Sequence, residues 1–341
     1  MDRGDAPGVT ARTPIALTIA GSDSGGGAGV QADLKTFAAL GVFGVSAIAA
    51  LTAQNTRGVR AVHYAPPEIV AAQIEAVLSD FSVAAIKVGM LGRPEIVGAV
   101  AEALGCFPPW PAAGEGLGVR GRRARAPSTQ APRRDPSSGG PKGVRKDARL
   151  KTGYGPPPSP TRGEGGEAFI VYDPVLIASS GDRLIGAGFV EAIKQNLLPM
   201  VDCLTPNLAE AAALLGEPIA GSEADMARQG EALLALGPRA VLMKGGHLAG
   251  EEAVDLLVAG GQTIRFAAAK IASRNLHGTG CVLSSAIAAH VALGLGLREA
   301  VGAAKAFVRQ AIEAGRDLEL GAGVGPLAPA RLARPGSPDV R

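Results

Sequence analysis

The stretch 277–285, His-Gly-Thr-Gly-Cys-Val-Leu-Ser-Ser, contains the residue types best suited to chemistry in this chain. Gly278 and Gly280 permit backbone angles that a Cβ would forbid, so a tight turn is expected. The proline-free run 282–297 behind them is rich in alanine and leucine and predicts a helix. The free N–H groups where a helix begins attract an anion, and they favour a thiolate at Cys281 as well. The alternative is a tight loop with a buried cysteine.

A second glycine-rich turn covers residues 21–29, between a β-rich run at 15–20 and apolar residues at helical spacing over 30–40. The turn is not G-x-G-x-x-G followed by an acid at the right distance, and no Gly-Lys-Ser/Thr follows it. A dinucleotide fold and a P-loop are therefore both disfavoured. Glycines here would let the backbone approach a small ligand closely, and the alternative is a flexible turn.

Polar side chains also follow other predicted strands. Residues 52–56, Thr-Ala-Gln-Asn-Thr, end the strand predicted at 42–51, and open α/β sheets bind ligands at the carboxyl ends of their strands. Asn207 and Glu210 are three residues apart at a predicted helix start, so both face the same way. Glu210 is equally typical of an ordinary capping acid. Lys244 follows another short strand.

The elements that would position these residues alternate regularly. Further helices are predicted at 67–78, 94–104, 188–198, 226–236 and 297–314, the last of which contains Lys305. Further strands are predicted at 84–88, 168–172, 201–204 and 240–243, with a β-hairpin over 256–258 and 263–266. This alternation predicts one α/β domain of the doubly wound type.

The charge of the chain is unevenly distributed. The formal net charge is +3, but residues 105–167 alone contain 12 Lys+Arg against 5 Asp+Glu. The basic excess thus belongs to one segment and is poor evidence for a nucleic-acid partner. That segment is rich in glycine and proline and poor in large apolar residues, so it cannot bury enough surface to offset its ordering entropy. We expect a disordered insertion between a helix and the next strand, with RNA binding as the alternative.

The remaining composition favours a protein of a reducing compartment. The three cysteines are widely spaced and odd in number, which argues against a disulfide framework or a metal cluster. The first 13 residues contain no apolar segment typical of a secretory signal, and no apolar run is long enough for a membrane span. We therefore expect a cytoplasmic protein with no membrane partner.

Eight motifs then carry a family resemblance. They are Ala-Leu-Thr-Ile-Ala-Gly-Ser-Asp-Ser-Gly-Gly-Gly-Ala-Gly-Val-Gln-Ala-Asp-Leu-Lys (16–35), Ala-Gln-Asn-Thr (53–56), Lys-Val-Gly-Met-Leu (87–91), Asp-Pro-Val (173–175), Ser-Gly-Asp (180–182), Thr-Pro-Asn-Leu-x-Glu (205–210), Lys-Gly-Gly-His (244–247) and His-Gly-Thr-Gly-Cys (277–281). In this order they resemble the hydroxymethylpyrimidine/phosphomethylpyrimidine kinases of thiamine biosynthesis. That resemblance implies a single ribokinase-like domain with a mostly parallel central sheet and helices on both faces.

The resemblance also implies a role for each matching position. Six residues correspond to contacts with the aminopyrimidine: Gly21, Ala28, Asp33, Gln54, Met90 and Val175. Four correspond to the nucleotide side: Asn207, Lys244, Thr279 and Lys305. Glu210, with Asp173 as a supporting acid, corresponds to the magnesium region. Gly278, Thr279, Gly280 and Cys281 correspond to the catalytic anion hole.

The implied reaction uses ATP and Mg²⁺. The hydroxymethyl oxygen would attack the γ-phosphorus, and a second turnover on the monophosphate would give the pyrophosphate. Positioning and charge neutralisation would carry most of the catalysis. Whether Cys281 acts as the base or only positions the substrate stays open. It would become a usable base if the helix start lowered its thiol pKa.

The resemblance covers a domain at 14–320, interrupted by 105–167 and flanked by flexible tails at 1–13 and 327–341. Relatives usually lack so long an insertion, and the tail here lacks the histidines common in the family. Family members are often dimers, so a homodimer is expected. Two alternatives stay open: a pyridoxal or pyridoxine kinase of the same family, and a non-catalytic pyrimidine-binding protein.

Overall fold

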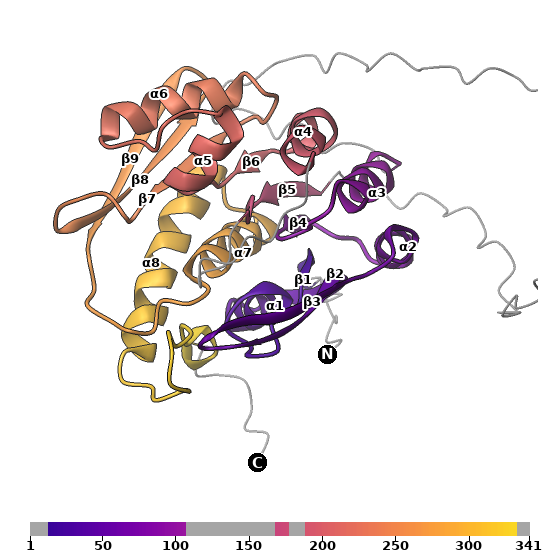
Figure 1. Ribbon diagram of the computed structural model, residues 1–341, viewed down its shortest axis with the longest axis horizontal. Coiled ribbons are helices and arrows are strands. Elements are labelled where there is room, and N and C mark those ends of the chain that lie inside the picture. The colour runs from indigo at the N-terminus through magenta and orange to yellow at the C-terminus, as the bar shows by residue number, and fades with distance from the viewer. Residues whose placement is uncertain (1–12, 107–167, 177–187, 333–341) are drawn as a thin grey trace, which may run out of the picture.

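A computed structural model describes residues 13–106, 168–176 and 188–332 as one nine-stranded sheet in the order β3-β2-β1-β4-β5-β6-β7-β8-β9 (Figure 1). Six neighbouring strands run parallel, in the order β2, β1, β4, β5, β6 and β7, while β3, β8 and β9 pair antiparallel. The strand bounds are β1 Ile15–Gly21, β2 Phe43–Asn55, β3 Gly58–Tyr64, β4 Ala85–Val88, β5 Phe169–Tyr172, β6 Cys203–Leu204, β7 Val241–Gly245, β8 Glu252–Ala259 and β9 Gln262–Ala269.

Helices cover both faces of the sheet, as expected for parallel strands that are buried on both sides. One core packs beneath α2, α3, the α4 segment, α5 and α6, and the other beneath α1, α7 and α8. The helix bounds are α1 Gly29–Ala39, α2 Pro67–Leu78, α3 Pro94–Gly105, α4 Phe189–Ala192, α5 Leu208–Leu215, α6 Glu223–Leu234, α7 Thr279–Ala292 and α8 Leu297–Gly315. The predicted fold class is confirmed.

The chain reverses its direction across the sheet between β1 and β4. β1 pairs with β2 on one side and with β4 on the other, so the first three strands extend one way and the later strands extend the other way. Open α/β sheets bind ligands in the crevice outside the carboxyl ends of the strands at such a point. The crevice next to Gly21 and the residues after Val88 is therefore where the topology places a ligand.

The second strand is longer than predicted and has a partner that the sequence analysis missed. We expected residues 52–56 to lie beyond a strand, but β2 continues to Asn55 and turns back into β3. Because β3 runs antiparallel at the sheet edge, the polar cluster lies on a hairpin that extends past the ends of the parallel strands. Side chains at its tip can therefore reach over the crevice.

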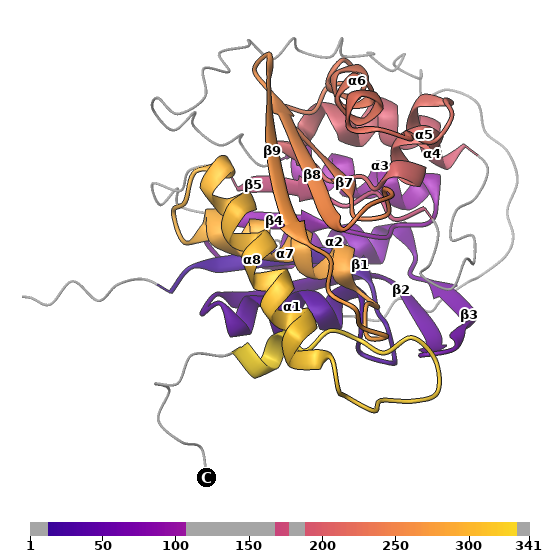
Figure 2. The ribbon, with the colours of Figure 1, turned by 90° about the vertical axis from the view of Figure 1, so that its left-hand side faces the viewer.

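At the opposite edge, β8 and β9 form the predicted hairpin with a turn at Gly260 and Gly261, both at positive φ. Figure 2 shows this hairpin lying beside α8, to which it is tied by a hydrogen bond from Arg309 to the carbonyl of Ala269 (2.7 Å). The helix predicted at 188–198 is instead short and irregular: α4 continues as a π-helix over Ile193–Leu197 and a 3-10 turn over Leu198–Met200.

Some predicted boundaries shift and others fall outside the description. The C-terminal tail does not begin at 327, because Leu327 and Ala328 are buried and a 3-10 helix, η3, covers Pro329–Leu332. Most of the insertion predicted at 105–167, the first 12 residues and the Ser-Gly-Asp motif at 180–182 lie outside the described residues. Within the described residues, no helix is long and apolar enough to cross a membrane.

Candidate active site

Lys244 occupies the centre of a buried charge cluster where β5 and β7 end. Its Nζ lies 2.7 Å from Oδ1 of Asp173 and 3.7 Å from Oε2 of Glu210. The Lys244 side chain is 13% exposed, whereas that of Asp173 is only 2% exposed. Burial disfavours the ammonium, but Asp173 and Glu210 more than compensate and raise the pKa of Lys244 above its usual value. Lys244 is thus a fixed cation at the carboxyl edge of the sheet.

The start of α7 lies directly over this cluster. A Cβ on Gly280 would come within 3.1 Å of Lys244 Nζ and 3.5 Å of Asp173 Oδ2, so only a glycine leaves that space clear. The helix is preceded by Gly278 at φ 86°, as the predicted turn requires. In an α-helix the first N–H groups have no intrahelical acceptor, so those of Gly280 and Cys281 are open to an anion. This geometry suits a transferring phosphoryl group.

Thr279 braces that turn. Its hydroxyl donates a 2.6 Å hydrogen bond to the carbonyl of Leu276, so the Oγ1 proton is already committed. One turn further along, Ser284 donates to the carbonyls of Gly280 and Cys281 at 2.9 and 3.1 Å. These two hydroxyls hold the backbone of the predicted anion hole in shape.

Cys281 differs from the thiolate that the sequence analysis considered. Two helix starts meet at its sulfur, since it lies in the first turn of α7 and receives a hydrogen bond from the N–H of Gly29, the first residue of α1. Burial nevertheless dominates and raises the pKa of the Cys281 thiol to about 11, even though nearby Lys87 favours the thiolate. The condition under which Cys281 would be a usable base, a lowered thiol pKa, is therefore not met in the free protein.

Asp33 lies in the floor beneath the site and has no solvent exposure. Its carboxylate accepts hydrogen bonds from Thr18 (2.6 Å), Ser285 (2.6 Å) and fully buried Lys87 (2.9 and 3.0 Å). These partners come from β1, α7 and β4, so one carboxylate joins three elements to α1. Since both oxygens are occupied and buried, the geometry favours a positioning role for Asp33 over the expected ring contact.

An apolar cluster lies where the topology places a ligand. Met90 packs with Ala50, and the partly buried Val62, Tyr64 and Val175 pack against them. Gly21 borders this cluster: its N–H donates to the carbonyl of Met90 (3.1 Å), and a Cβ on it would lie 2.5 Å from the Met90 Cε. Three of the six predicted substrate residues, Gly21, Met90 and Val175, are thus brought together.

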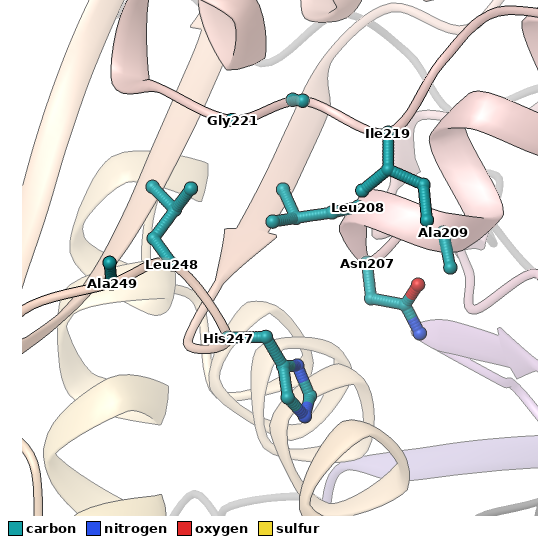
Figure 3. A pocket seen from close by; sticks show the side chains of 9 residues that line it. Asn207, Leu208, Ala209, Ile219, Gly221, His247, Leu248 and Ala249 are labelled. Atoms are coloured by element: carbon teal, nitrogen blue, oxygen red, sulfur yellow. The ribbon is translucent and has the colours of Figure 1, made fainter.

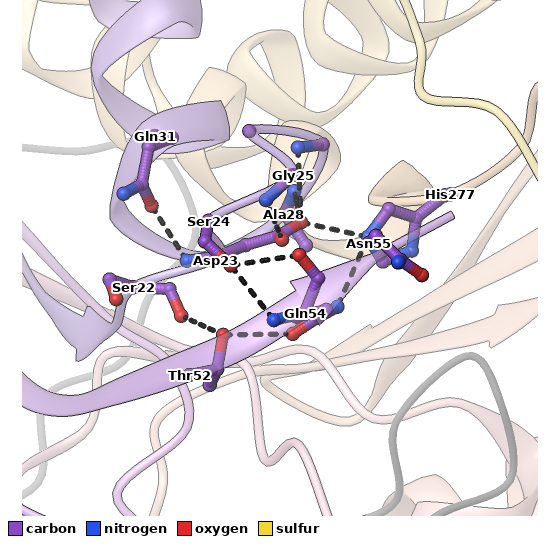
Figure 4. A network of polar contacts seen from close by, with 12 residues as sticks. Ser22, Asp23, Ser24, Gly25, Ala28, Gln31, Thr52, Gln54, Asn55 and His277 are labelled. Atoms are coloured by element: carbon purple, nitrogen blue, oxygen red, sulfur yellow. Dashed lines mark hydrogen bonds and ion pairs between the residues drawn. The ribbon is translucent and has the colours of Figure 1, made fainter. Parts of the chain in front are cut away.

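The glycine-rich turn binds a group that belongs to the chain itself. The Asp23 carboxylate accepts hydrogen bonds from the N–H groups of Gly25 (2.8 Å), Gly27 (3.0 Å) and Ala28 (2.9 Å), as Figure 4 shows in part. Those three N–H groups are therefore not free for a ligand, contrary to the simplest interpretation of the turn. Ala28 lies beside Gly278, whose absent Cβ leaves room for the carbonyl of Gly27. The glycine-rich turn and the start of α7 are in contact.

Gln54 and His277 meet under that turn. His277 Nε2 lies 2.9 Å from Asp23 Oδ2 and 3.4 Å from the Gln54 side-chain nitrogen (Figure 4). Gln54 comes from the β2–β3 hairpin and His277 from the segment before α7, so residues 223 positions apart are joined. Sequence analysis assigned no role to Asp23 or His277 individually, although both lie inside quoted motifs.

Asn207 and Glu210 form a reciprocal capping box at the start of α5. The Glu210 N–H donates to Asn207 Oδ1 (2.9 Å), and the Asn207 N–H donates to Glu210 Oε2 (2.7 Å). The capping alternative is therefore confirmed, but Glu210 also faces Lys244. Burial raises the pKa of Glu210 to about 7, although Lys244 opposes this shift. A further cation would therefore stabilise the ionised form of this carboxylate.

A cavity of about 410 Å³ opens beside the capping box (Figure 3). Its walls include Asn207, Leu208, Ile219, His247 and Leu248, of which only Asn207 belongs to the predicted site residues. The cavity thus borders the Lys244 cluster on the α5 side. None of the residues in the apolar cluster around Met90 lines this cavity.

Lys305 does not reach the site directly. Its Nζ lies 2.5 Å from Asp255 Oδ2 on β8, and Asp255 Oδ1 in turn accepts the N–H of Gly245 at 3.1 Å. Lys305 therefore braces the residue after Lys244 through Asp255. Asp255 and Lys87 are the functional neighbours that sequence analysis missed; Lys87 stood in a quoted motif, while Asp255 had no distinguishing signal.

The chain is similar to known proteins over most of its length. A profile of the phosphomethylpyrimidine kinase family matches residues 23–109 and 164–328, which leaves out most of the basic insertion. A hydroxymethylpyrimidine/phosphomethylpyrimidine kinase of Rhizobium meliloti (strain 1021) is 47% identical over 315 residues, covering 92% of this chain and 96% of the relative.

Two solved structures share the fold. The phosphomethylpyrimidine kinase of Clostridium difficile 630 is 36% identical with a TM-score of 0.62, and the match covers 87% of this chain and 99% of that one. The pyridoxal kinase of Staphylococcus aureus, solved with AMP-PCP and pyridoxal, is 27% identical with a TM-score of 0.69, and the match covers 94% of both chains.

Proposed function

Because the chain belongs to the phosphomethylpyrimidine kinase family, we propose that it transfers the γ-phosphoryl group of ATP to 4-amino-5-hydroxymethyl-2-methylpyrimidine and then to the resulting monophosphate. The two products are the monophosphate and pyrophosphate used in thiamine biosynthesis. Family membership and the identity of 47% support a kinase, so the non-catalytic alternative is set aside.

One observation carries this proposal: two residues that follow β5, only two positions apart, belong to the charge cluster and to the apolar cluster. Asp173 pairs with Lys244, while Val175 packs against the apolar cluster that contains Met90, and the Val175 N–H donates to the Asp173 carbonyl at 2.9 Å. A ring held against Val175 thus lies next to the fixed cation. Such an arrangement suits a small hydroxymethyl arm that reaches from an apolar site into a phosphoryl site.

The chain's own residues then have distinct tasks in the proposed transfer. Gly21, Met90 and Val175 hold the methylpyrimidine ring, and Gln54 contacts its polar edge. Lys244 and the first N–H groups of α7 stabilise the charge on the transferring phosphoryl group. A direct in-line transfer requires no covalent intermediate on the protein. Asn207, Thr279 and Lys305 support the nucleotide side through the hydrogen bonds described above.

Cys281 is the group nearest to the α7 start that could take the hydroxyl proton. At a pKa of about 11 it is a thiol in the free protein, so it would not be a resting base. Ionisation would require the substrates to change its surroundings. We therefore assign Cys281 to positioning in the free enzyme.

We further propose that Mg²⁺ accompanies ATP. Glu210 and Asp173 are the carboxylates available, and Mg²⁺ in such sites usually takes one or two carboxylates together with phosphates and water. No group of three or more His, Cys, Asp or Glu side chains that could hold a metal ion occurs among the described residues. When bound, Mg²⁺ would neutralise phosphate charge.

A second candidate, pyridoxal kinase activity, is favoured by one observation. The S. aureus pyridoxal kinase has a higher TM-score (0.69) than the C. difficile pyrimidine kinase (0.62), although its identity is lower (27% against 36%). Both substrates carry a hydroxymethyl group on a six-membered heteroaromatic ring. Cross-activity on pyridoxine is therefore the natural alternative to test.

The deciding experiment offers ATP and Mg²⁺ with hydroxymethylpyrimidine or with pyridoxine, and resolves the products by mass spectrometry. Mono- and diphosphate from the pyrimidine are expected. Product from pyridoxine alone would replace the proposed function with vitamin B6 salvage. A lack of product from either substrate would reject both.

We also propose a cytoplasmic homodimer. The edge strand β3 and the exposed Leu51 beside it (54% exposed) are surfaces that a second copy could cover. Light scattering on the purified chain tests this, since a monomeric mass at micromolar concentration would reject it.

A further inference from the structure

The backbone of Gln54 is held rigidly beneath the glycine-rich turn. Its N–H donates to the Ser24 hydroxyl oxygen (2.8 Å), and the same hydroxyl donates to the Gln54 carbonyl (2.8 Å). This two-way clamp leaves the side-chain amide as the adjustable part of the residue. An amide has an oxygen end and an NH₂ end, and a 180° rotation exchanges them.

The protonation of His277 follows from its partner. Burial opposes ionisation of Asp23, but hydrogen bonds from His277, Gly25 and Ala28 hold its pKa below the usual value. The Asp23 carboxylate is therefore ionised and can only accept hydrogen bonds. His277 Nε2, 2.9 Å from Asp23 Oδ2, must then carry the proton.

The state of His277 decides which end of the Gln54 amide can lie beside it. A protonated Nε2 cannot accept from the Gln54 nitrogen that lies 3.4 Å away, so that orientation sets two donors against each other. The other end of the amide has a matching conflict. Thr52 Oγ1 has one proton and gives it to the carbonyl of Ser22 (2.8 Å), yet it also faces Gln54 Oε1 at 3.2 Å.

One rotation of the amide removes both conflicts. With the oxygen beside His277 and the NH₂ group beside Thr52, the histidine proton meets an acceptor and the threonine oxygen accepts a hydrogen bond. Two independent counts of donors and acceptors therefore select the same orientation. We propose that His277 and Thr52 are positioning residues that fix the Gln54 amide and thereby specify an amino group, and not an oxo group, on the substrate ring.

The choice between an amino and an oxo substrate depends on the donors and acceptors along the edge of the pyrimidine ring, and this step rests on the proposed function. A 4-aminopyrimidine presents an N–H donor beside the ring-nitrogen acceptor N3. Its 4-oxo analogue presents an acceptor beside an N3–H donor, which is the reverse pattern. An amide locked in one orientation matches only one of these, and a rotating amide can match either.

The test compares kcat/KM for hydroxymethylpyrimidine with kcat/KM for its 4-oxo analogue. In His277→Leu the ratio is expected to fall about tenfold, because one matched hydrogen bond to the ring is no longer enforced. Thr52→Val should lower it in the same direction, and His277→Gln, which retains an N–H donor, should restore it. His63→Leu, the same change at an exposed histidine on β3, should leave the ratio unchanged.

A double-variant cycle shows whether His277 acts through Gln54. In a Gln54→Met background, His277→Leu should not change the ratio further. If His277 were merely structural, both substrates would lose activity in parallel and the ratio would stay constant, which would overturn the proposal. A further change of ratio in the Gln54→Met background would overturn it equally.

NMR can determine the orientation of the Gln54 side-chain amide without a measurement of turnover. In protein with ¹⁵N-labelled glutamine, the Gln54 side-chain amide protons should give an NOE to the Thr52 methyl group, and His277→Leu should weaken it. No such NOE in the parent protein would reject the inference even if the pyrimidine is phosphorylated. Failure of phosphorylation with the NOE present would instead reject the proposed function and leave the amide orientation established.

Discussion

Lys244 Nζ lies 2.7 Å from Oδ1 of Asp173, and this ion pair is covered by the one residue at the start of α7 that has no side chain, Gly280. The pair joins β7 to the end of β5 and places a cation next to the first turn of α7. Anion affinity at this point thus depends on three separate elements. Each of them can be perturbed separately.

Replacing Lys244 tests how much its positive charge contributes to catalysis. Lys244→Met should lower kcat about 100-fold or more, because a preorganised charge next to the phosphoryl group is lost. It should also reduce thermal stability, since the Asp173 carboxylate stays buried without its partner. Steady-state kinetics and thermal denaturation give the two values. Arg228→Met, which removes an exposed cation paired with Glu217, is the matched control; equal kinetic losses in both variants would contradict the assignment.

A methyl group added at position 280 should lower activity because it displaces the Lys244 ammonium. In Gly280→Ala the new Cβ would lie 3.1 Å from Lys244 Nζ, so the ammonium has to move by a few tenths of an ångström. We expect kcat to fall about tenfold while the fold is retained, because misplacement of a catalytic group is costly.

Gly98→Ala is the control for that change. A Cβ there would meet nothing within 4 Å, and the position lies inside helix α3. Its free energy of unfolding should rise by about 0.5–1 kcal/mol, with kinetics unchanged. Full activity in Gly280→Ala would show that the gap above Lys244 is not used.

Local patterns were enough to predict most of the elements. The helix at 67–78 was predicted with its observed bounds, because Pro67 opens it and apolar residues recur at helical spacing up to Leu78. The strand Gly58–Tyr64 was missed, because its seven residues follow a turn without a strong signal and their burial alternates only over residues 61–64. Edge strands pair through the backbone, which side-chain periodicity records only weakly.

The site was predictable where a motif carries its own geometry and unpredictable where distant residues meet. Gly278 and Gly280 were enough to predict the turn before α7. No local pattern reports that Asp33 meets Ser285, which is 252 positions away, or that Asp23 fills the glycine-rich turn with its own carboxylate. For that reason Asp33 was expected to contact substrate, and its burial among three donor groups became visible only in the fold.

The buried pair Asp33–Lys87 should matter first for stability. Lys87→Met removes one partner and leaves a carboxylate with no solvent exposure, which costs about 3–5 kcal/mol of unfolding free energy. The double variant Asp33→Asn/Lys87→Met should recover part of that loss, because no uncompensated charge remains. Urea denaturation measures both. A double variant less stable than Lys87→Met alone would show that the pair does not act as a unit.

Glu210 should make stability depend on pH in a defined direction. Its pKa is raised from 4.5 to about 7 in the fold, so between these values the folded protein retains a proton that the unfolded chain has lost. Rising pH therefore destabilises the fold through this group. In Glu210→Gln the cap survives and the titration disappears. The variant should gain stability relative to the parent as pH rises from 4.5 to 7, with a constant difference outside that window.

Chemical denaturation at pH 5 and pH 8 provides that comparison. Glu223→Gln is the matched control, since Glu223 is an exposed helix-start acid that pairs with Arg265. The relative gain between the two pH values should be seen for Glu210→Gln and not for Glu223→Gln. An opposite trend, with Glu210→Gln losing stability at pH 8, would show that Lys244 outweighs burial at this carboxylate.

Cys281 should be an unreactive thiol in the free enzyme, although it lies where a helix begins. Burial raises its pKa to about 11, so at pH 7 only about one molecule in 10,000 carries the thiolate that reacts with alkylating agents. Iodoacetamide labelling, followed by mass spectrometry, should be slow at pH 7 and should accelerate up to about pH 11. The exposed Cys106 serves as the internal control for reagent access. Rapid labelling of Cys281 at pH 7 would mean that the helix starts and Lys87 outweigh burial, and Cys281 would then regain its place as a resting base.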